Sequence, residues 1–204
     1  MLFEIHDQNP DLTKLNEVAN ILLNGGVIIY PTDTVYAMGC SLQHKKAIQQ
    51  LAKLKDIKLK KANFSIMFYD LSQLSEYTKH IDRSTYKILN KNLPGPFTFI
   101  LEASPQIPKL FDTNKKTVGI RIPENKIVRE LVQILGHPLV TTSLHDEDEI
   151  LEYTTDPQII EGNWMDKVDA IIDGGYGNNV PSTVVDLSEG YTNILRQGIG
   201  ELRE

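Results

Sequence analysis

Apolar residues near the start of the chain follow two different periods in close succession. Residues 11–24 open with Asp11, a good N-cap, and end before the glycine pair 25–26. Between them, one helical stripe is apolar: Leu12, Leu15, Val18, Ile21 and Leu22. The spacing predicts a helix, and the uninterrupted apolar run at residues 27–30 predicts a buried strand directly after it.

The rest of the chain interleaves helical spacing with short apolar runs. Helices are predicted over residues 44–54, 70–77, 84–92, 124–135 and 156–163. Strands are predicted over residues 63–69, 97–101, 117–121, 139–143, 168–173, 182–187 and 193–196. Because helices and strands do not alternate strictly, we expect an α/β (α+β) fold with a twisted mixed sheet and flanking helices. No linker and no fixed-period repeat divides the chain, so residues 1–204 are expected to form a single domain.

The stretch 27–39 combines a buried strand with a polar turn. Pro31 ends the strand, and three polar side chains, Thr32, Asp33 and Thr34, follow it. The carboxyl ends of strands in open α/β sheets face ligand-binding crevices, which favours a binding site here. An equally weighted interpretation is a simple turn followed by a helix cap.

Composition and charge narrow the class of protein. The hydrophobic content of 41% and charged content of 24% are typical of a globular protein. No apolar run approaches the roughly 20 residues of a membrane span, and the amino terminus does not resemble a secretory signal, so a cytoplasmic protein is expected. The single cysteine, Cys40, is interpreted as a small buried residue rather than a nucleophile.

Positive charge is concentrated in one segment, although the formal net charge is −6. Residues 44–61 contain one acid, Asp56, and seven lysines: Lys45, Lys46, Lys53, Lys55, Lys58, Lys60 and Lys61. This excess could hold phosphates or a nucleic-acid backbone, or it could be a solvated face without a partner.

Polar residues at the ends of predicted strands are the candidates for chemistry. The sequence contains neither a phosphate-binding P-loop nor a dinucleotide fingerprint, and the histidines lack zinc-ligand spacing. Arg121 stands in an apolar strand before Pro123, so burial requires either an anionic ligand or a fixed carboxylate partner. The other strand-end candidates are Thr141, Thr142, Ser143, His145, Ser182, Thr183 and Arg196.

Five segments together resemble the YrdC family of threonylcarbamoyl-AMP synthases, which act in tRNA modification. They are GGVIIYPTDTVY at 25–36, PGPFT at 94–98, VGIRIP at 118–123, PSTVVD at 181–186 and RQG at 196–198. The resemblance covers nearly the whole chain. It implies a twisted mixed sheet around a deep cavity, and a nucleotidyltransferase that joins L-threonine, or a related small carboxylate, with bicarbonate and ATP, accompanied by Mg²⁺.

The resemblance also implies roles for individual residues. Lys55, Arg121 and Ser143 would be catalytic. The amino-acid substrate would be held by Thr32, Arg121, Thr141 and Ser182. ATP would be held by Lys53, Lys55, Ser143, His145 and Arg196. The alternative is a non-catalytic module that binds double-stranded RNA or tRNA through the lysine-rich segment.

Three positions depart from the synthase pattern. The Lys-x-Arg-Pro motif is replaced by residues 53–58, where Lys55 could stand for the first cation but no arginine follows. Ser-x-Asn becomes Ser143-Leu144-His145, and Phe68 occupies the place of a histidine near the amino acid. Because these departures resemble the YciO branch of the family, we expect this chain to belong to that branch.

Overall fold

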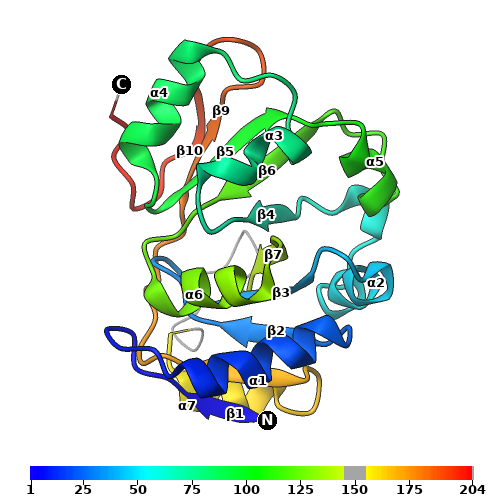
Figure 1. The fold of residues 1–204 in the computed structure, drawn as a ribbon, viewed down its shortest axis with the longest axis vertical. Helices are drawn as coiled ribbons and strands as arrows, with labels where there is room; N and C mark the ends of the chain where they lie inside the picture. The colour runs from blue at the N-terminus through cyan, green and yellow to red at the C-terminus, as the bar shows by residue number, and fades with distance from the viewer. Residues whose placement is uncertain (145–154, 204) are drawn as a thin grey trace.

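Ten strands form one mixed sheet in the computed structural model, which describes residues 1–144 and 155–203 (Figure 1). The strands are β1 (Leu2–Glu4), β2 (Val27–Tyr30), β3 (Ala37–Ser41), β4 (Ser65–Met67), β5 (Phe97–Glu102), β6 (Thr117–Arg121), β7 (Leu139–Ser143), β8 (Ala170–Asp173), β9 (Thr183–Asp186) and β10 (Asn193–Arg196). Their order across the sheet is β1-β8-β2-β3-β7-β4-β6-β5-β9-β10. The predicted α/β fold with a mixed sheet is therefore confirmed.

Helices cover the sheet on both faces. They are α1 (Leu12–Leu23), α2 (Lys45–Leu54), α3 (Leu74–Tyr77), α4 (Arg83–Asn92), α5 (Gln106–Phe111), α6 (Lys126–Leu135) and α7 (Pro157–Trp164), with 3-10 turns η1 (Leu59–Lys61) and η2 (Leu71–Gln73). The side chain of Asp11 caps α1 as predicted, accepting from the backbone N–H groups of Thr13 and Lys14. Gly136 ends α6 in the left-handed region, with φ of 74°.

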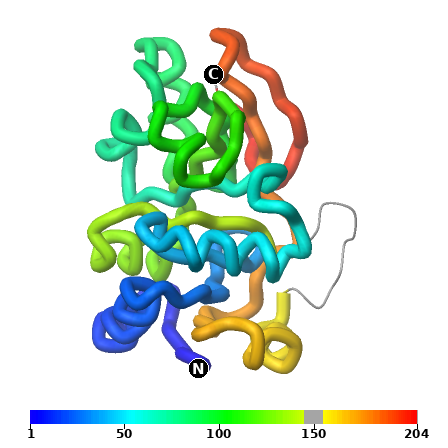
Figure 2. Tube along the Cα trace, turned by 90° about the vertical axis from the view of Figure 1, so that its right-hand side faces the viewer, coloured from blue at the N-terminus to red at the C-terminus, as the bar shows by residue number. Residues whose placement is uncertain are grey.

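Strand direction determines which loops meet at one edge of the sheet. β2 and β8 are parallel, and β3 is antiparallel to both β2 and β7. The carboxyl ends of β2, β7 and β8 therefore lie at the same edge, where the polar residues after Pro31 were expected to form a site. Figure 2 shows the course of the chain from a second side.

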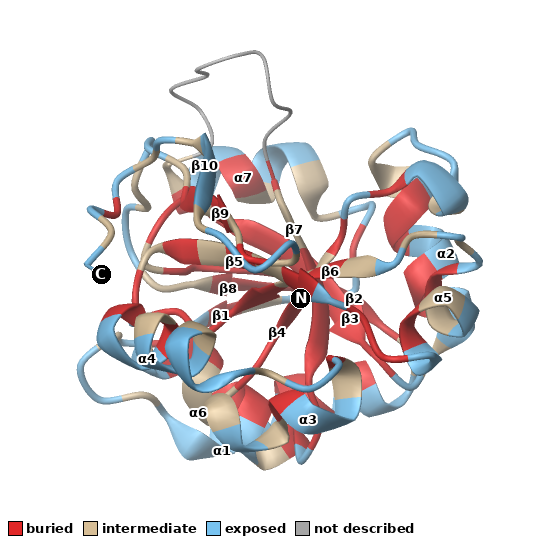
Figure 3. Cartoon of the chain, turned by 90° about the horizontal axis from the view of Figure 1, so that it is seen from above, coloured by how far each residue is buried: buried red, intermediate tan, exposed pale blue. Residues whose placement is uncertain are grey.

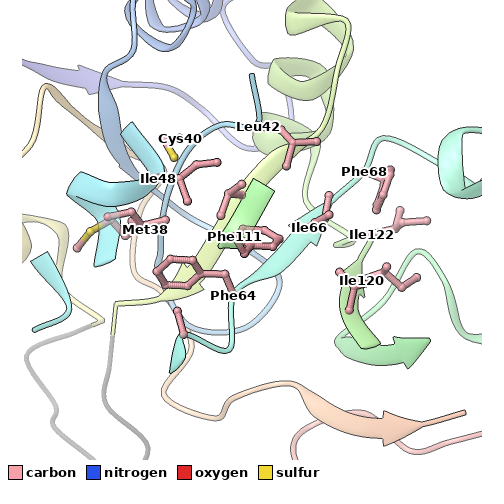
Figure 4. Packing of buried hydrophobic residues seen from close by; sticks show 14 of the residues in the cluster. Met38, Cys40, Leu42, Ile48, Phe64, Ile66, Phe68, Phe111, Ile120 and Ile122 are labelled. Atoms are coloured by element: carbon pink, nitrogen blue, oxygen red, sulfur yellow. The ribbon is translucent and has the colours of Figure 1, made fainter. Parts of the chain in front are cut away.

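Two apolar cores lie on opposite faces of the sheet, which explains why β2 is buried along its whole length. Ile28 and Tyr30 pack with α1 and α6, whereas Val27 and Ile29 belong to the core on the other face. Figure 3 shows the buried strands between exposed helix surfaces. Figure 4 shows part of the second core, in which Met38 of β3, Ile48 of α2 and Phe111 of α5 belong to one cluster.

The strand β3 corrects one of the two interpretations of the turn after Pro31. A helix cap was considered there, but the chain turns directly into β3, which pairs with β2 and β7 along its length. Gly39 makes this pairing possible, because a Cβ at that position would lie 2.9 Å from the Tyr30 hydroxyl oxygen. The strand β1 and the helix α5 were also not predicted.

Cys40 lies within β3 and is completely buried. Burial raises the pKa of its thiol to about 12, so the thiolate is scarcely populated near neutral pH. The prediction of a small buried residue is confirmed. Among residues 1–144 and 155–203, no helix has the length and apolar character of a membrane span.

Candidate functional site

A buried ion pair joins two distant strand ends. Arg121 Nη2, at the end of β6, lies 3.0 Å from Asp33 Oδ1 in the turn after β2, and their side chains are only 8% and 9% exposed. Asp33 uses its second oxygen, Oδ2, to accept the backbone N–H of Glu124 at 3.0 Å. Of the two partners considered for Arg121, the structure therefore contains the fixed carboxylate.

Hydroxyl groups extend this pair into the turn after β2. Arg121 Nη2 also donates to Thr34 Oγ1 at 3.0 Å, and Thr34 Oγ1 lies 3.1 Å from Thr32 Oγ1. The Thr32 hydroxyl donates to the Val35 carbonyl and accepts from the Thr34 backbone N–H. With Thr34 as a further donor, the one proton and two lone pairs of Thr32 are all used within the turn. Thr32 thus orients Thr34, and a direct contact of its hydroxyl with a substrate stays a prediction.

The guanidinium of Arg121 has donors besides Nη2. Its Nε is buried and has no hydrogen-bond partner among the described residues. A buried donor without a partner costs free energy, so the guanidinium retains capacity for an acceptor beyond Asp33 and Thr34. A carboxylate oxygen is a suitable acceptor for this group.

Strand register brings most of the predicted substrate residues to one face of the sheet. Thr141 lies across from Ser65, and Ser65 lies across from Gly119, two residues before Arg121. Because cross-strand partners and alternate residues share a face, Arg121, Thr141 and Ser143 all belong to the same face. On that face, Ser65 and Ser143 are half-buried.

The same face continues toward the other end of the sheet through hydroxyl groups. Gly119 lies across from Ile100, two residues after Thr98, and Thr98 Oγ1 lies 2.8 Å from Ser182 Oγ. Arg196 donates to the Ser182 carbonyl through Nε at 3.2 Å and Nη2 at 2.9 Å. We call this set the polar strip; its members are Ser65, Thr98, Gly119, Arg121, Thr141, Ser143 and Ser182, with Arg196 at one end.

Two buried tyrosine hydroxyls form hydrogen bonds, one with Thr141 of the strip and the other with the turn after β8. The Tyr30 hydroxyl donates to Thr141 Oγ1 at 2.6 Å, and complete burial raises the pKa of the Tyr30 phenol well above its usual value. The Tyr36 hydroxyl donates to the Gly175 carbonyl at 2.7 Å and accepts from the Gly174 N–H, and burial raises its pKa to about 12. Both groups are therefore neutral hydrogen-bonding residues near pH 7.

The predicted nucleotide residues are only partly brought together. Lys55 Nζ donates to the Ser143 carbonyl at 3.2 Å, which joins the end of α2 to the end of β7. Lys53 is exposed on α2, and His145 lies outside the described residues. The contacts of these groups with a nucleotide stay predictions.

A hollow opens beside the turn after β2. Its volume is about 490 Å³, and its lining residues are Thr155, Tyr176, Gly177, Asn178 and Asn179. The backbone N–H of Asn178 donates to the Thr34 carbonyl at 3.1 Å, which places the hollow next to the turn. None of the predicted site residues that the structure describes belongs to this lining.

Sequence reasoning missed Asp33 as the specific partner of Arg121, and it missed Thr98 and Tyr30. Asp33 could have been identified as this partner, because it is the acid in the turn after Pro31 and a buried arginine needs a carboxylate. Thr98 carried a weaker signal, since its side of β5 depends on register. Tyr30 carried none, because its hydroxyl position depends on the missing Cβ of Gly39.

Fold and site together define a mixed-sheet α/β protein with a polar strip and a buried arginine on one sheet face. A family model named Sua5_yciO_yrdC and described as "Telomere recombination" matches residues 20–198. The chain belongs to this Sua5/YciO/YrdC family.

Known relatives span both branches of the family. Escherichia coli (strain K12) YciO, an uncharacterized protein, is 36% identical over 98% of this chain and 97% of its own. Its crystal structure superposes with a TM-score of 0.89. A Methanocaldococcus jannaschii protein named putative threonylcarbamoyl-AMP synthase is 31% identical over 97% of this chain and 93% of its own.

A more distant structure has the same fold. P. abyssi Sua5, solved in complex with L-threonine, is 24% identical and has a TM-score of 0.87. This chain covers 62% of that protein. The predicted resemblance to the YrdC family, and to its YciO branch, is confirmed.

Proposed function

We propose that this protein is a threonylcarbamoyl-AMP synthase-like nucleotidyltransferase, acting on L-threonine or a related small amino acid and linked to tRNA modification. The observation that carries the proposal is the buried Arg121, which keeps an unpartnered Nε on the polar strip. The name of the M. jannaschii relative supports the reaction, and the P. abyssi complex supports an amino acid as substrate.

The reaction requires no protein nucleophile. The amino group of the substrate combines with bicarbonate to give a carbamate and water. A carbamate oxygen then attacks the α-phosphorus of ATP, the bond to the bridging α–β oxygen breaks, and pyrophosphate leaves. Such a step depends on positioning and on neutralising the charge of the departing phosphates.

The amino acid would be held beside Arg121 in the polar strip. Arg121 would donate Nε to its carboxylate, because a charge-assisted hydrogen bond satisfies the buried donor. The hydroxyl of Thr141 accepts from Tyr30, so its own proton is available to the substrate. Ser182 would contact the same substrate, and Thr32 would act by orienting Thr34.

The nucleotide would occupy the part of the strip near Ser143. In this proposal, Lys55 faces the phosphates, with Lys53 and His145 nearby, and Arg196 faces them from the Ser182 end of the strip. Mg²⁺ would enter with ATP, since it is usually bound through phosphate oxygens and water. Lysine offers a point charge rather than a bidentate fork, so the phosphates would be oriented less tightly than by an arginine.

Pyrophosphate release tests this proposal. Purified protein is incubated with ATP, Mg²⁺ and bicarbonate, and each amino acid is added in turn. We expect release that depends on an amino acid, with an Arg121→Lys variant reduced at least about tenfold in kcat/KM for it.

The matched control is Arg129→Lys. Arg129 lies on α6, donates to the Tyr69 carbonyl and stacks over the Tyr69 ring, and it is not a member of the polar strip. Its rate should stay within about twofold of the wild type. Equal rates for wild type and Arg121→Lys, at equal folded fraction, would refute the proposed role of the arginine.

The lysine-rich segment favours a second candidate, binding of double-stranded RNA or tRNA. Lys115 Nζ donates to the carbonyls of Lys61 and Ala62, and Thr113 donates to the Lys60 carbonyl. These bonds fasten the segment after α5 to η1, and Figure 1 shows α5 above α2 on the same side of the molecule. The combined lysine face contains Lys45, Lys46, Lys53, Lys55, Lys58, Lys60, Lys61, Lys109, Lys115 and Lys116.

Charge separation supports this candidate. The lysine face carries ten lysines against two acids, Asp56 and Asp112, a net charge of +8, so the rest of the chain carries −14 to give −6 overall. Within the part of the chain that the structure describes, no carboxylate pairs with Lys58, Lys60 or Lys61. Unpaired ammonium groups on a fixed backbone are suited to phosphate contacts.

Salt dependence tests the second candidate. Affinity for a labelled RNA duplex, measured by fluorescence anisotropy, should fall steeply with salt, and a Lys53→Ala variant should lower the logarithmic slope by about one. The control is Lys87→Ala on α4, which should leave the slope unchanged. A flat salt response of the wild type would rule this candidate out.

A further inference from the structure

Asp33 divides its two carboxylate oxygens between two elements. Oδ1 accepts from Arg121 Nη2 at 3.0 Å, and Oδ2 accepts from the backbone N–H of Glu124 at 3.0 Å. The second bond ties the turn after β2 to the segment that follows β6. Asp33 is therefore fixed from both sides, and so is the acceptor that it offers to the arginine.

A guanidinium group is planar, so fixing one end fixes the direction of the other. Nη2 of Arg121 is held by two acceptors, Asp33 Oδ1 and Thr34 Oγ1, each at 3.0 Å. The hydroxyl chain from Thr34 through Thr32 to the Val35 carbonyl fixes the second acceptor in turn. The direction of the Nε–H bond is thus determined by groups that belong to the turn.

The geometry points to Asp33 as a positioning residue, which aims Arg121 Nε at the carboxylate of the amino-acid substrate. This inference rests on the proposed function for the identity of the ligand. Asp33 leaves Nε unpartnered because it engages the guanidinium through Nη2 with one oxygen only. A side-on bidentate pair, in which the carboxylate accepts from both Nε and Nη2, would have occupied the donor that the substrate needs.

Two variants separate positioning from a general structural role. Asp33→Asn removes one of the two acceptor oxygens and the negative charge, and Thr34→Val removes the second acceptor of Nη2 while keeping the side-chain shape. Asp186→Asn is the matched control, because Asp186 ends the strand β9 and its carboxylate accepts from the Ser188 backbone N–H in the turn that follows. All variants are compared with the wild type at equal folded fraction by circular dichroism.

The first readout is steady-state kinetics of pyrophosphate release. We expect the KM for the amino acid to rise at least about tenfold in Asp33→Asn and Thr34→Val, while the KM for ATP changes less than about twofold. A structural role alone would lower the active fraction and leave both KM values unchanged. That second pattern would overturn the inference.

The second readout does not depend on activity. The chain has five arginines, so its ¹H–¹⁵N spectrum contains five side-chain Nε–H signals, and the signal absent from Arg121→Lys is that of Arg121. In the wild type this signal should be sharp and should shift when L-threonine is added. In Asp33→Asn and Thr34→Val it should broaden and lose that shift.

The two readouts distinguish failure of the inference from failure of the proposed function. Absence of amino-acid-dependent pyrophosphate release by the wild type would refute the function but leave the spectrum to judge Asp33. A sharp, unchanged Arg121 signal in both Asp33→Asn and Thr34→Val would overturn the positioning role whatever the activity. If Asp33→Asn does not fold, Thr34→Val alone decides by the same criteria.

Discussion

The hydrogen bond between Tyr30 and Thr141 allows a quantitative test of how the polar strip is supported. Both side chains are buried, with exposed fractions of 0% and 2%, and their oxygens lie 2.6 Å apart. The substitution Tyr30→Phe removes the donor and leaves the Thr141 hydroxyl without it. Thr141→Val removes the acceptor and leaves the Tyr30 hydroxyl unpaired.

Each single substitution should lower the free energy of unfolding by about 1–3 kcal/mol, because a buried polar group loses its partner. The double variant replaces both partners by apolar groups of similar shape, and should be nearly as stable as the wild type. The expected coupling energy is the sum of the two single effects, about 2–6 kcal/mol in magnitude. A coupling energy of this sign means that the hydrogen bond between Tyr30 and Thr141 stabilises the folded protein.

Urea denaturation of the four proteins measures this coupling, provided that the m-value is the same in each. Tyr86→Phe is the control, since Tyr86 is 48% exposed on α4, and its stability should change by less than about 0.5 kcal/mol. A coupling energy within about 0.5 kcal/mol of zero would mean that the two single effects are independent. The Tyr30 hydroxyl would then not be the partner of Thr141.

Two further predictions concern packing and pH. Gly119→Ala should lower stability by about 1–3 kcal/mol, because the new Cβ would lie 2.7 Å from Ser65 Oγ. The control is Gly162→Ala in α7, where the new Cβ would have nothing within 4 Å and the substitution should be neutral or stabilising. Equal effects of the two substitutions in thermal unfolding would contradict the packing explanation. Burial lowers the pKa of His137, so below about pH 6.5 the unfolded chain binds a proton that the folded chain does not. Stability should then fall as the pH decreases. His137→Gln should weaken this pH dependence, as measured by urea denaturation between pH 7 and 5. An identical pH dependence in both proteins would contradict the role of His137.

Elements whose identity depends on local sequence were predictable. The helix capped by Asp11 and the strand ended by Pro31 follow from side-chain chemistry within a few residues. The same is true of α6, whose apolar stripe and Gly136 stop are confirmed. These features need no knowledge of the rest of the fold.

Elements that depend on distant partners were not predictable. The strand β3 has the sequence AMGCS, which lacks both alternation and β-branched residues, and it is a strand because β2 and β7 lie on either side of it. The pair between Asp33 and Arg121 joins residues 88 positions apart. The sequence indicated that Arg121 needs a partner, but only the fold identifies Asp33 as that partner.

The position of Phe68 bears on which substrate the site can recognise. Synthases of this family are expected to have a histidine here, near the amino acid. In this chain, Phe68 is fully buried and packs edge-to-face against Tyr77, with the two ring centroids 5.5 Å apart. Its backbone N–H donates to the Arg121 carbonyl at 2.9 Å, but its phenyl group belongs to the core that contains Ile122, on the opposite face of the sheet from Arg121 (Figure 4). In the proposed function, Phe68 would offer the substrate no polar contact, and recognition of the amino acid would depend more heavily on Arg121 and on the hydroxyls of the polar strip. Because a carboxylate is common to all amino acids, discrimination among their side chains should be weaker than a histidine contact would give.

The pyrophosphate assay should therefore show release with several small amino acids rather than with L-threonine alone. Strict selectivity for L-threonine would show that another group supplies the missing contact.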